Sequence, residues 1–105
     1  MERRENQIDR HHILPSSRGG SGKAFNRIRV QKKRHKAYHI IFENLTPDEV
    51  MELIFKIYNH RLFEKLPKRQ RLAWILLFGK DAEYYQVRHI LMYEFGFARY
   101  FKGGE

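Results

Sequence analysis

The pattern of apolar and polar positions predicts two short strands followed by helices. Residues 7–14 hold three apolar side chains and stop at Pro15, which is typical of a strand. Residues 15–25 are rich in serine and glycine and predict a flexible loop. Residues 26–31 alternate apolar and basic side chains, so we expect a half-buried strand with a basic outer face. A helix is expected to follow over residues 33–42.

The second half of the chain predicts three more helices. Thr46 can cap a helix, Pro47 suits a first turn, and Glu49 completes a capping box with Thr46. We expect this helix to reach residue 63, a third helix over residues 67–78, and a fourth that Asp81 caps and that ends at residue 95.

The apolar stripes of these helices predict the core. The run 73–78 is apolar nearly all round, so we expect it to be well buried, in part by a second copy or another protein partner. The fold class that follows is α+β, with residues 46–105 as a helical extension packed on residues 1–45 in one domain. The expected core positions are Val50, Leu53, Ile54, Ile57 and Leu62, then Leu72, Ile75, Leu76 and Phe78 with Trp74 on another side, then Tyr85, Ile90, Leu91, Met92 and Phe95.

Composition excludes several classes of protein. The 105 residues include no cysteine, which excludes a disulfide-stabilised domain and a cysteine-ligated zinc site. The longest apolar run has six residues, far short of the ~20 that a membrane-spanning helix needs. The first ten residues are too polar for a secretory signal, and we expect a cytoplasmic protein without a membrane partner.

The net charge of +9 is concentrated near the N-terminus. Residues 1–40 contain eleven Lys and Arg against three acidic residues, whereas residues 41–105 contain ten against nine. This asymmetry predicts an anionic partner for the first segment, most commonly nucleic acid. The residues expected to contact phosphates are Arg10, Arg18, Lys23, Arg27, Arg29, Lys32, Lys33, Arg34 and Lys36.

Four histidines lie in the same basic segment. His35 and His39 are four apart in an expected helix, so their side chains share one face and suit a common metal ion. His11 and His12 lie near the end of the first expected strand, and we expect this pair to supply a third ligand. Adjacent strand residues point to opposite faces, so we expect only one of this pair to reach the metal.

These residues resemble the HNH endonuclease family, which has the ββα-metal (His-Me finger) fold. The matching features are residues 10–15 (Arg-His-His-Ile-Leu-Pro), residues 17–20 (Ser-Arg-Gly-Gly), Asn26, and residues 35–39 (His-Lys-Ala-Tyr-His). Fourteen positions separate His12 from Asn26, and nine separate Asn26 from the second histidine pair. The resemblance covers about a third of the chain and makes residues 1–45 the nuclease core.

The resemblance implies a role for each matching residue. His12 would be the general base that takes a proton from the attacking water, and Asn26 would hold the His12 ring by a hydrogen bond. His11, His35 and His39 would bind one divalent metal ion, which could be Mg²⁺, Mn²⁺, Ni²⁺ or Zn²⁺. A neutral imidazole suits proton abstraction because the ordinary histidine pKa is ~6.5. The Cys-x-x-Cys pairs that hold a structural zinc in many family members are absent here.

Three functions remain open from the sequence. We expect a metal-dependent endonuclease acting on nucleic acid, DNA in preference to RNA. The alternative is a non-catalytic nucleic-acid-binding protein that keeps the same frame, such as an RNA or ribonucleoprotein accessory factor. A structural metal site without a nucleic-acid role fits the basic segment least well. The glycines of residues 19–22 do not form a nucleotide-binding P-loop. That motif requires a glycine where this chain has Ser17, and a serine or threonine where it has Ala24.

Overall fold

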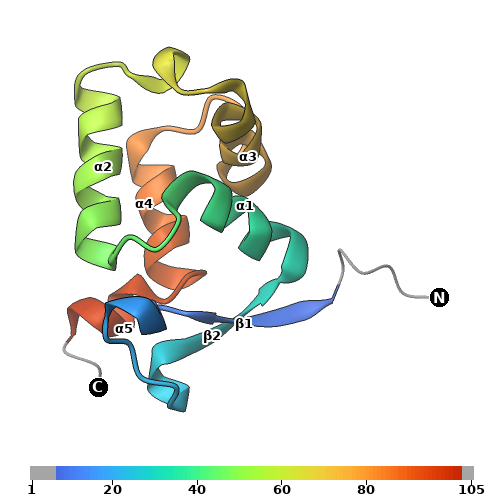
Figure 1. Cartoon of the computed structure of the whole chain (residues 1–105). Coiled ribbons are helices and arrows are strands. Elements are labelled where there is room, and N and C mark those ends of the chain that lie inside the picture. Colours follow the sequence, from blue (N-terminus) through green and yellow to red (C-terminus); the bar gives the residue numbers. More distant parts are fainter. Residues whose placement is uncertain (1–6, 103–105) are drawn as a thin grey trace.

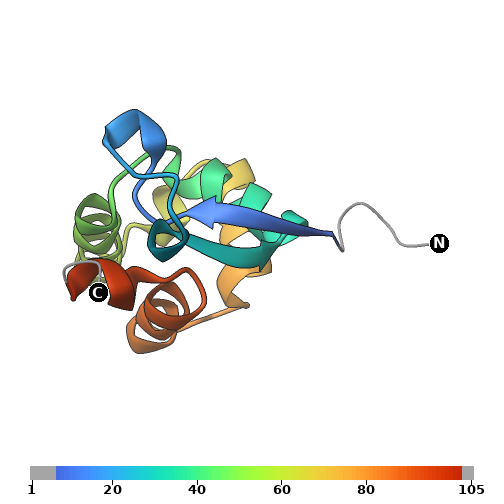
Figure 2. The same ribbon diagram turned by 90° about the horizontal axis from the view of Figure 1, so that it is seen from below.

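The computed structural model describes residues 7–102 and has the expected α+β organisation. A two-stranded antiparallel hairpin is followed by helices, which Figure 1 shows above the hairpin and Figure 2 shows from below. The elements are β1 (Ile8–His12), β2 (Arg27–Gln31), α1 (Lys32–Phe42), α2 (Pro47–Asn59), α3 (Lys68–Phe78), α4 (Tyr84–Tyr93) and α5 (Phe97–Phe101), with short 3-10 turns η2 (Ser16–Arg18), η3 (Ala24–Asn26) and η4 (Phe63–Lys65).

The register of the hairpin determines which side chains face the helices. His11 pairs with Ile28, and Arg10 pairs with Arg29. Because strand side chains alternate, one face carries buried His11 and the other carries exposed Arg10 and Arg29. Helix α1 begins directly after β2 and contacts both strands, so it covers the face that carries His11.

The predicted start of α2 is confirmed in detail. The Glu49 backbone N–H donates to Thr46 Oγ1 at 3.2 Å, and the Thr46 backbone N–H donates to Glu49 Oε1 at 2.9 Å. Pro47 occupies the first turn, as expected. This reciprocal cap satisfies two backbone donors that the helix itself leaves without partners.

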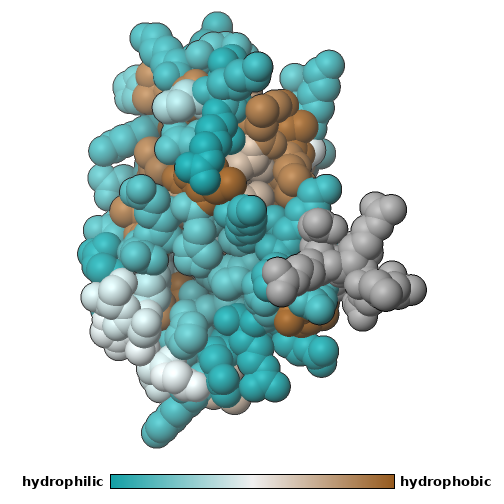
Figure 3. Space-filling model, turned by 45° about the vertical axis from the view of Figure 1, so that its right-hand side comes forward, coloured by the Kyte–Doolittle hydropathy of each residue, from teal (hydrophilic) through white to brown (hydrophobic). Residues whose placement is uncertain are grey.

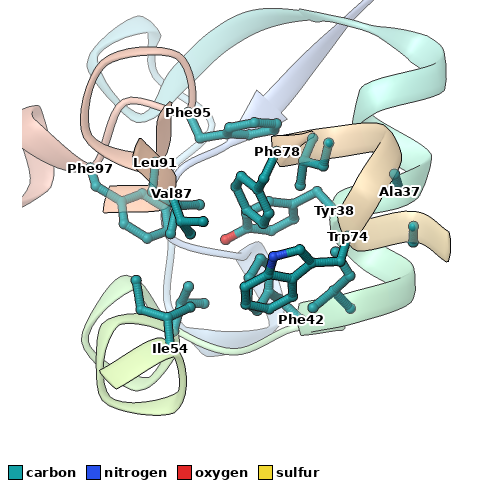
Figure 4. Packing of buried hydrophobic residues seen from close by; sticks show 14 of the residues in the cluster. Ala37, Tyr38, Phe42, Ile54, Trp74, Phe78, Val87, Leu91, Phe95 and Phe97 are labelled. Atoms are coloured by element: carbon teal, nitrogen blue, oxygen red, sulfur yellow. The ribbon is translucent and has the colours of Figure 1, made fainter. Parts of the chain in front are cut away.

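One hydrophobic core joins the two segments of the chain. It includes Ile13 and Val30 from the hairpin segment, and Tyr38 from α1 lies against Phe95, with ring centroids 4.9 Å apart. Figure 4 shows α1, α3 and the C-terminal helices contributing side chains to this cluster. Among residues 7–102, no helix combines the length and the apolar character that a membrane crossing requires.

The structure corrects the expected buried face of α3. Leu72, Ile75 and Leu76 are 57%, 39% and 42% exposed, although they were expected in the core. Phe78 is buried as expected, and the other buried positions are Ala73, Trp74 and Leu77. Apolar residues surround this helix, so the pattern alone does not select a face, and packing against α1 selects the one with Trp74.

Three other expectations about the C-terminal half are wrong. Helix α2 was expected to reach residue 63, but it ends at Asn59, and the separate 3-10 turn η4 follows. Asp81 has a left-handed φ of 58° and lies before α4, whose capping box is formed by Glu83 and Gln86. Tyr85 is exposed and not in the core. Helix α5 was not expected, because it has only five residues and starts after Gly96 in a left-handed conformation.

Candidate metal centre

Three histidines from two elements converge between the hairpin and α1. His11 comes from β1, and His35 and His39 come from successive turns of α1. One ring nitrogen from each lies within 4.8 Å of the corresponding nitrogen of the other two. The grouping expected from the sequence is therefore confirmed: these side chains lie close enough to hold one metal ion.

His11 forms the buried base of the site. Its side chain is 1% exposed and lies against Tyr38 and Phe95, at ring-centroid distances of 4.5 Å and 5.5 Å. Neither ring nitrogen has a hydrogen-bond partner among the described residues. Burial, the largest cause, and the charges of the neighbouring histidines together lower the pKa of His11 to about 3. The ring is therefore neutral near pH 7 and has a lone pair available for a metal.

Hydrogen bonds orient the two rings of α1 toward each other. His35 Nδ1 lies 3.0 Å from Asp9 Oδ2, and His39 Nδ1 lies 2.8 Å from the Glu43 carbonyl oxygen. A carboxylate and a carbonyl can only accept, so each Nδ1 donates and each neutral ring has its lone pair on Nε2. Burial also lowers the pKa of His39, which favours this neutral form.

The spacing of these nitrogens fits a shared cation. The Nε2 atoms of His35 and His39 are 3.1 Å apart. Two lone pairs at this distance repel each other unless a proton or a metal ion lies between them. Two ligands at ~2.0–2.1 Å from a tetrahedral metal are ~3.3 Å apart. The unpartnered nitrogens of His11 complete a set of three imidazoles, and such a set leaves a fourth metal position for another ligand.

Two residues that support the site were missed in the sequence. Asp9 lies two residues before His11 on the same strand, and period-two alternation could have placed both on one face. Glu43 ends α1 with a positive φ of 50°, and its carbonyl accepts from His39. A glutamate rarely adopts a positive φ, so the sequence does not predict this backbone conformation at Glu43.

His12 does not join this cluster. Strand alternation puts it on the opposite face of β1 from His11, where it pairs with Arg27. The side chain is only partly buried. It is still near enough to contribute to lowering the pKa of His11, as the weakest of the four causes.

Asn26 has a different role from the expected one. Its buried side chain accepts from the Leu14 N–H at 2.9 Å and donates to the carbonyls of Leu14 at 3.0 Å and Ser21 at 2.7 Å. No hydrogen bond to the His12 ring is found among the described residues, so the structure contradicts that expectation. Asn26 instead fastens the loop between the strands, and this loop approaches itself closely at Gly20.

Two of the predicted phosphate-binding arginines have structural partners. Arg18 donates to Glu49 at 2.7 Å and 3.0 Å and thereby ties the hairpin loop to α2. Arg34 pairs with Glu94 and lies over the Phe95 ring at 5.4 Å, which ties α1 to the end of α4. Both guanidinium groups therefore have an acidic partner within the fold, which the sequence did not indicate.

The other predicted basic residues remain on the surface. Arg10 and Arg29 face each other across the outer side of the hairpin, and Arg27 follows them beside His12. The buried Arg27 Nε has no hydrogen-bond partner among the described residues. Along the loop and α1, the exposed basic side chains are Lys23, Lys32, Lys33 and Lys36.

Comparison of the chain with protein-family models, curated proteins and solved structures found no match.

Proposed function

We propose that the protein is a metal-dependent endonuclease of the HNH type that hydrolyses phosphodiester bonds, with DNA as the favoured substrate. One observation carries this proposal: a partly buried cluster of three histidines in a strongly basic hairpin-and-helix segment. The order and spacing of the motif residues support it from the sequence. A three-imidazole site without nearby nucleic acid would not explain the excess charge around it.

The residues of this chain would divide the work of hydrolysis. His11, His35 and His39 would hold a divalent metal ion, which supplies positive charge to neutralise the phosphate and the departing oxygen. His12 would accept a proton from the attacking water while the water oxygen bonds to phosphorus and the bond from phosphorus to the departing ester oxygen breaks. The departing oxygen would then take a proton from solvent. Arg27 is paired with His12 across the hairpin, so its guanidinium group is suited to hold a phosphate oxygen there.

The ligand set favours some metals over others. Imidazole nitrogens suit zinc, nickel and similar ions, whereas Mg²⁺ prefers oxygen ligands. Asp9 is directed at His35 and not into the nitrogen cluster, as its contact with Nδ1 indicates. We therefore expect Zn²⁺ or Ni²⁺ to bind this site more tightly than Mg²⁺.

A specific observation favours the alternative function. His12 lies on the opposite strand face from His11, and both N–H groups of the Asn26 amide donate within the loop. A protein that binds nucleic acid without cutting it needs the basic surface but no histidine aligned with the metal. Such a protein would keep the hairpin, the helix and the metal as a rigid frame.

Cleavage of supercoiled plasmid separates the two functions. Purified protein is incubated with plasmid DNA, and in parallel with a structured RNA, in buffers containing Mg²⁺, Mn²⁺, Ni²⁺ or Zn²⁺. The test variant is His12→Ala, and the matched control is His60→Ala, which changes an exposed histidine at the end of α2. We expect metal-dependent cleavage by the native protein and by the control, and a loss of about 10²-fold or more in His12→Ala.

Two results would contradict the nuclease proposal. Undiminished cleavage in His12→Ala would remove the general-base assignment. Salt-sensitive binding of DNA or RNA by the native protein, with no cleavage in any of the four metals, would establish the non-catalytic alternative.

A further inference from the structure

A second candidate site lies away from the histidine cluster. A pocket of about 630 Å³ opens between the end of α2, the η4 turn, α3 and the turn before α4. Figure 1 shows these parts at the top of the molecule and the hairpin at the bottom. None of the three clustered histidines is among the residues that line the pocket, and its volume is in the range of small-molecule sites, ~300–1,000 Å³.

The interior of this pocket is apolar and aromatic. Ile57 and Trp74 line it and are almost fully buried, and Tyr58 and Phe63 are packed beside them. Ile75 continues the apolar surface to the outside, where it is 39% exposed. Figure 3 shows hydrophobic surface among hydrophilic side chains in this upper part of the molecule. An aromatic ring of a ligand could therefore be sheltered here from water.

The rim of the pocket is positively charged. It carries four basic side chains, whereas its acidic side chains are Glu64 and Asp81. Glu64 is 82% exposed and lies 3.5 Å from Arg71, so it neutralises that guanidinium only weakly. The basic residues are Arg61, Lys68, Arg71 and Lys80.

Two further features favour an anion at this rim. The buried Nε of Arg71 has no hydrogen-bond partner among the described residues, although an unpaired buried donor is costly. Helix α3 begins beside the pocket at Lys68, without a side-chain cap or an acidic residue in its first turn. The first N–H groups of such a helix and its dipole attract negative charge.

The backbone around the pocket is held in unusual conformations. Arg61 and Asp81 have left-handed φ values of 52° and 58°, and Gly79 has a φ of 96°. Non-glycine residues in this region store strain, which clusters at binding sites. The Tyr58 hydroxyl donates to the Ala82 carbonyl at 2.6 Å and holds the turn in place. The turn on one side of the pocket is therefore held in place by the fold itself.

We propose that this pocket binds a small organic anion that has an aromatic or similarly apolar body and one carboxylate. The apolar body lies against Trp74 and Ile57, and the carboxylate accepts from Arg71 and lies near Lys80. This site is independent of the proposed nuclease function, because the two share no residue.

The only tryptophan of the chain provides a direct assay. Trp74 lines the pocket, so its fluorescence reports occupancy. The probes are phenylacetate and phenylacetamide, which have similar shapes but differ in charge. We expect a saturable change in emission with phenylacetate, and binding about tenfold tighter than that of phenylacetamide, because a hydrogen bond to a charged group is stronger than a neutral one.

Substitutions locate the charge preference within the pocket. Arg71→Gln should remove most of the difference in affinity between the two probes. Lys80→Gln changes an exposed side chain in the turn before α4 and should reduce that difference. Lys65→Gln is the matched control, because Lys65 is exposed on η4 and does not line the pocket. The control should keep the full preference for phenylacetate.

The native protein alone can overturn the proposal, whatever the variants do. Equal affinity for phenylacetate and phenylacetamide would show that the rim does not select an anion. Unchanged Trp74 emission with both probes, together with unchanged backbone amide NMR signals of α3, would show that the pocket does not take such a ligand.

Discussion

Replacing His11 with leucine should stabilise the metal-free protein. His11 is buried against aromatic rings, and neither of its ring nitrogens has a partner among the described residues. Leucine has a similar volume and no polar atom, so His11→Leu removes this defect and keeps the packing. A histidine retained at such a position at the expense of stability is expected where function requires it.

The size of the effect follows from the burial. A buried polar group without a partner costs about 1–3 kcal/mol of stability, and His11→Leu removes this cost. An imperfect fit of the leucine side chain destabilises the variant by up to about 1.5 kcal/mol. We therefore expect the free energy of unfolding of His11→Leu to exceed that of the native protein by about 1 kcal/mol at pH 7. This corresponds to a melting temperature about 4–8 °C higher for a domain of this size.

The assay is urea unfolding, followed by circular dichroism, first with a chelator and then with excess Zn²⁺. Metal at 100 times its dissociation constant adds about 2.7 kcal/mol to the native protein but little to His11→Leu, so the order of stability should reverse. His89→Leu is the matched control, because His89 is exposed on α4 and contacts Tyr93. Its unfolding free energy should change by no more than about 0.5 kcal/mol in either condition.

A His11→Leu protein that is less stable than the native protein in chelator would refute this reasoning. It would mean that the imidazole makes stabilising contacts beyond its packing. Equal stabilisation of both proteins by Zn²⁺ would show that His11 is not a metal ligand.

Three further predictions concern the support of the site. Asp9→Ala should weaken metal affinity about 10–100-fold in a calorimetric titration, because His35 loses the partner that orients it. Gly20→Ala should destabilise the fold by at least about 1–3 kcal/mol in urea, because its Cβ would overlap the Leu14 carbonyl group and lie 2.9 Å from the Asn26 amide nitrogen. Gly22→Ala meets nothing within 4 Å and should be tolerated. The metal-free native protein should lose stability as pH falls from 6.5 toward 3 in urea unfolding. Over this range His11 binds a proton in the unfolded chain but not in the folded protein, where its pKa is lowered. The loss should be shallower in His11→Leu.

The local signals of the sequence predicted several elements well. Thr46, Pro47 and Glu49 marked the start of α2, because a capping box involves only neighbouring residues. The spacing of His35 and His39 placed them on one face of α1, because helical periodicity is also local. Such features depend little on the rest of the fold.

Features that depend on distant contacts were predicted poorly. The face of α3 with Trp74 is buried because α1 packs against it, and nothing within residues 68–78 indicates that choice. Likewise, α5 is held by Arg99, which donates to the Arg27 carbonyl at 3.0 Å, far away in the sequence. The pairing of Arg18 with Glu49 was not predicted either, because Glu49 lies 31 residues further along the chain.

X-ray absorption of the protein loaded with one equivalent of Zn²⁺ tests the central claim most directly. The account predicts three imidazole nitrogens at ~2.0–2.1 Å from the metal, supplied by His11, His35 and His39. If the spectrum of His39→Ala shows one imidazole fewer around the zinc, the coordinating nitrogens are assigned to this cluster. A shell made of oxygen ligands, or one that is unchanged in His39→Ala, would contradict the metal centre and the function proposed from it.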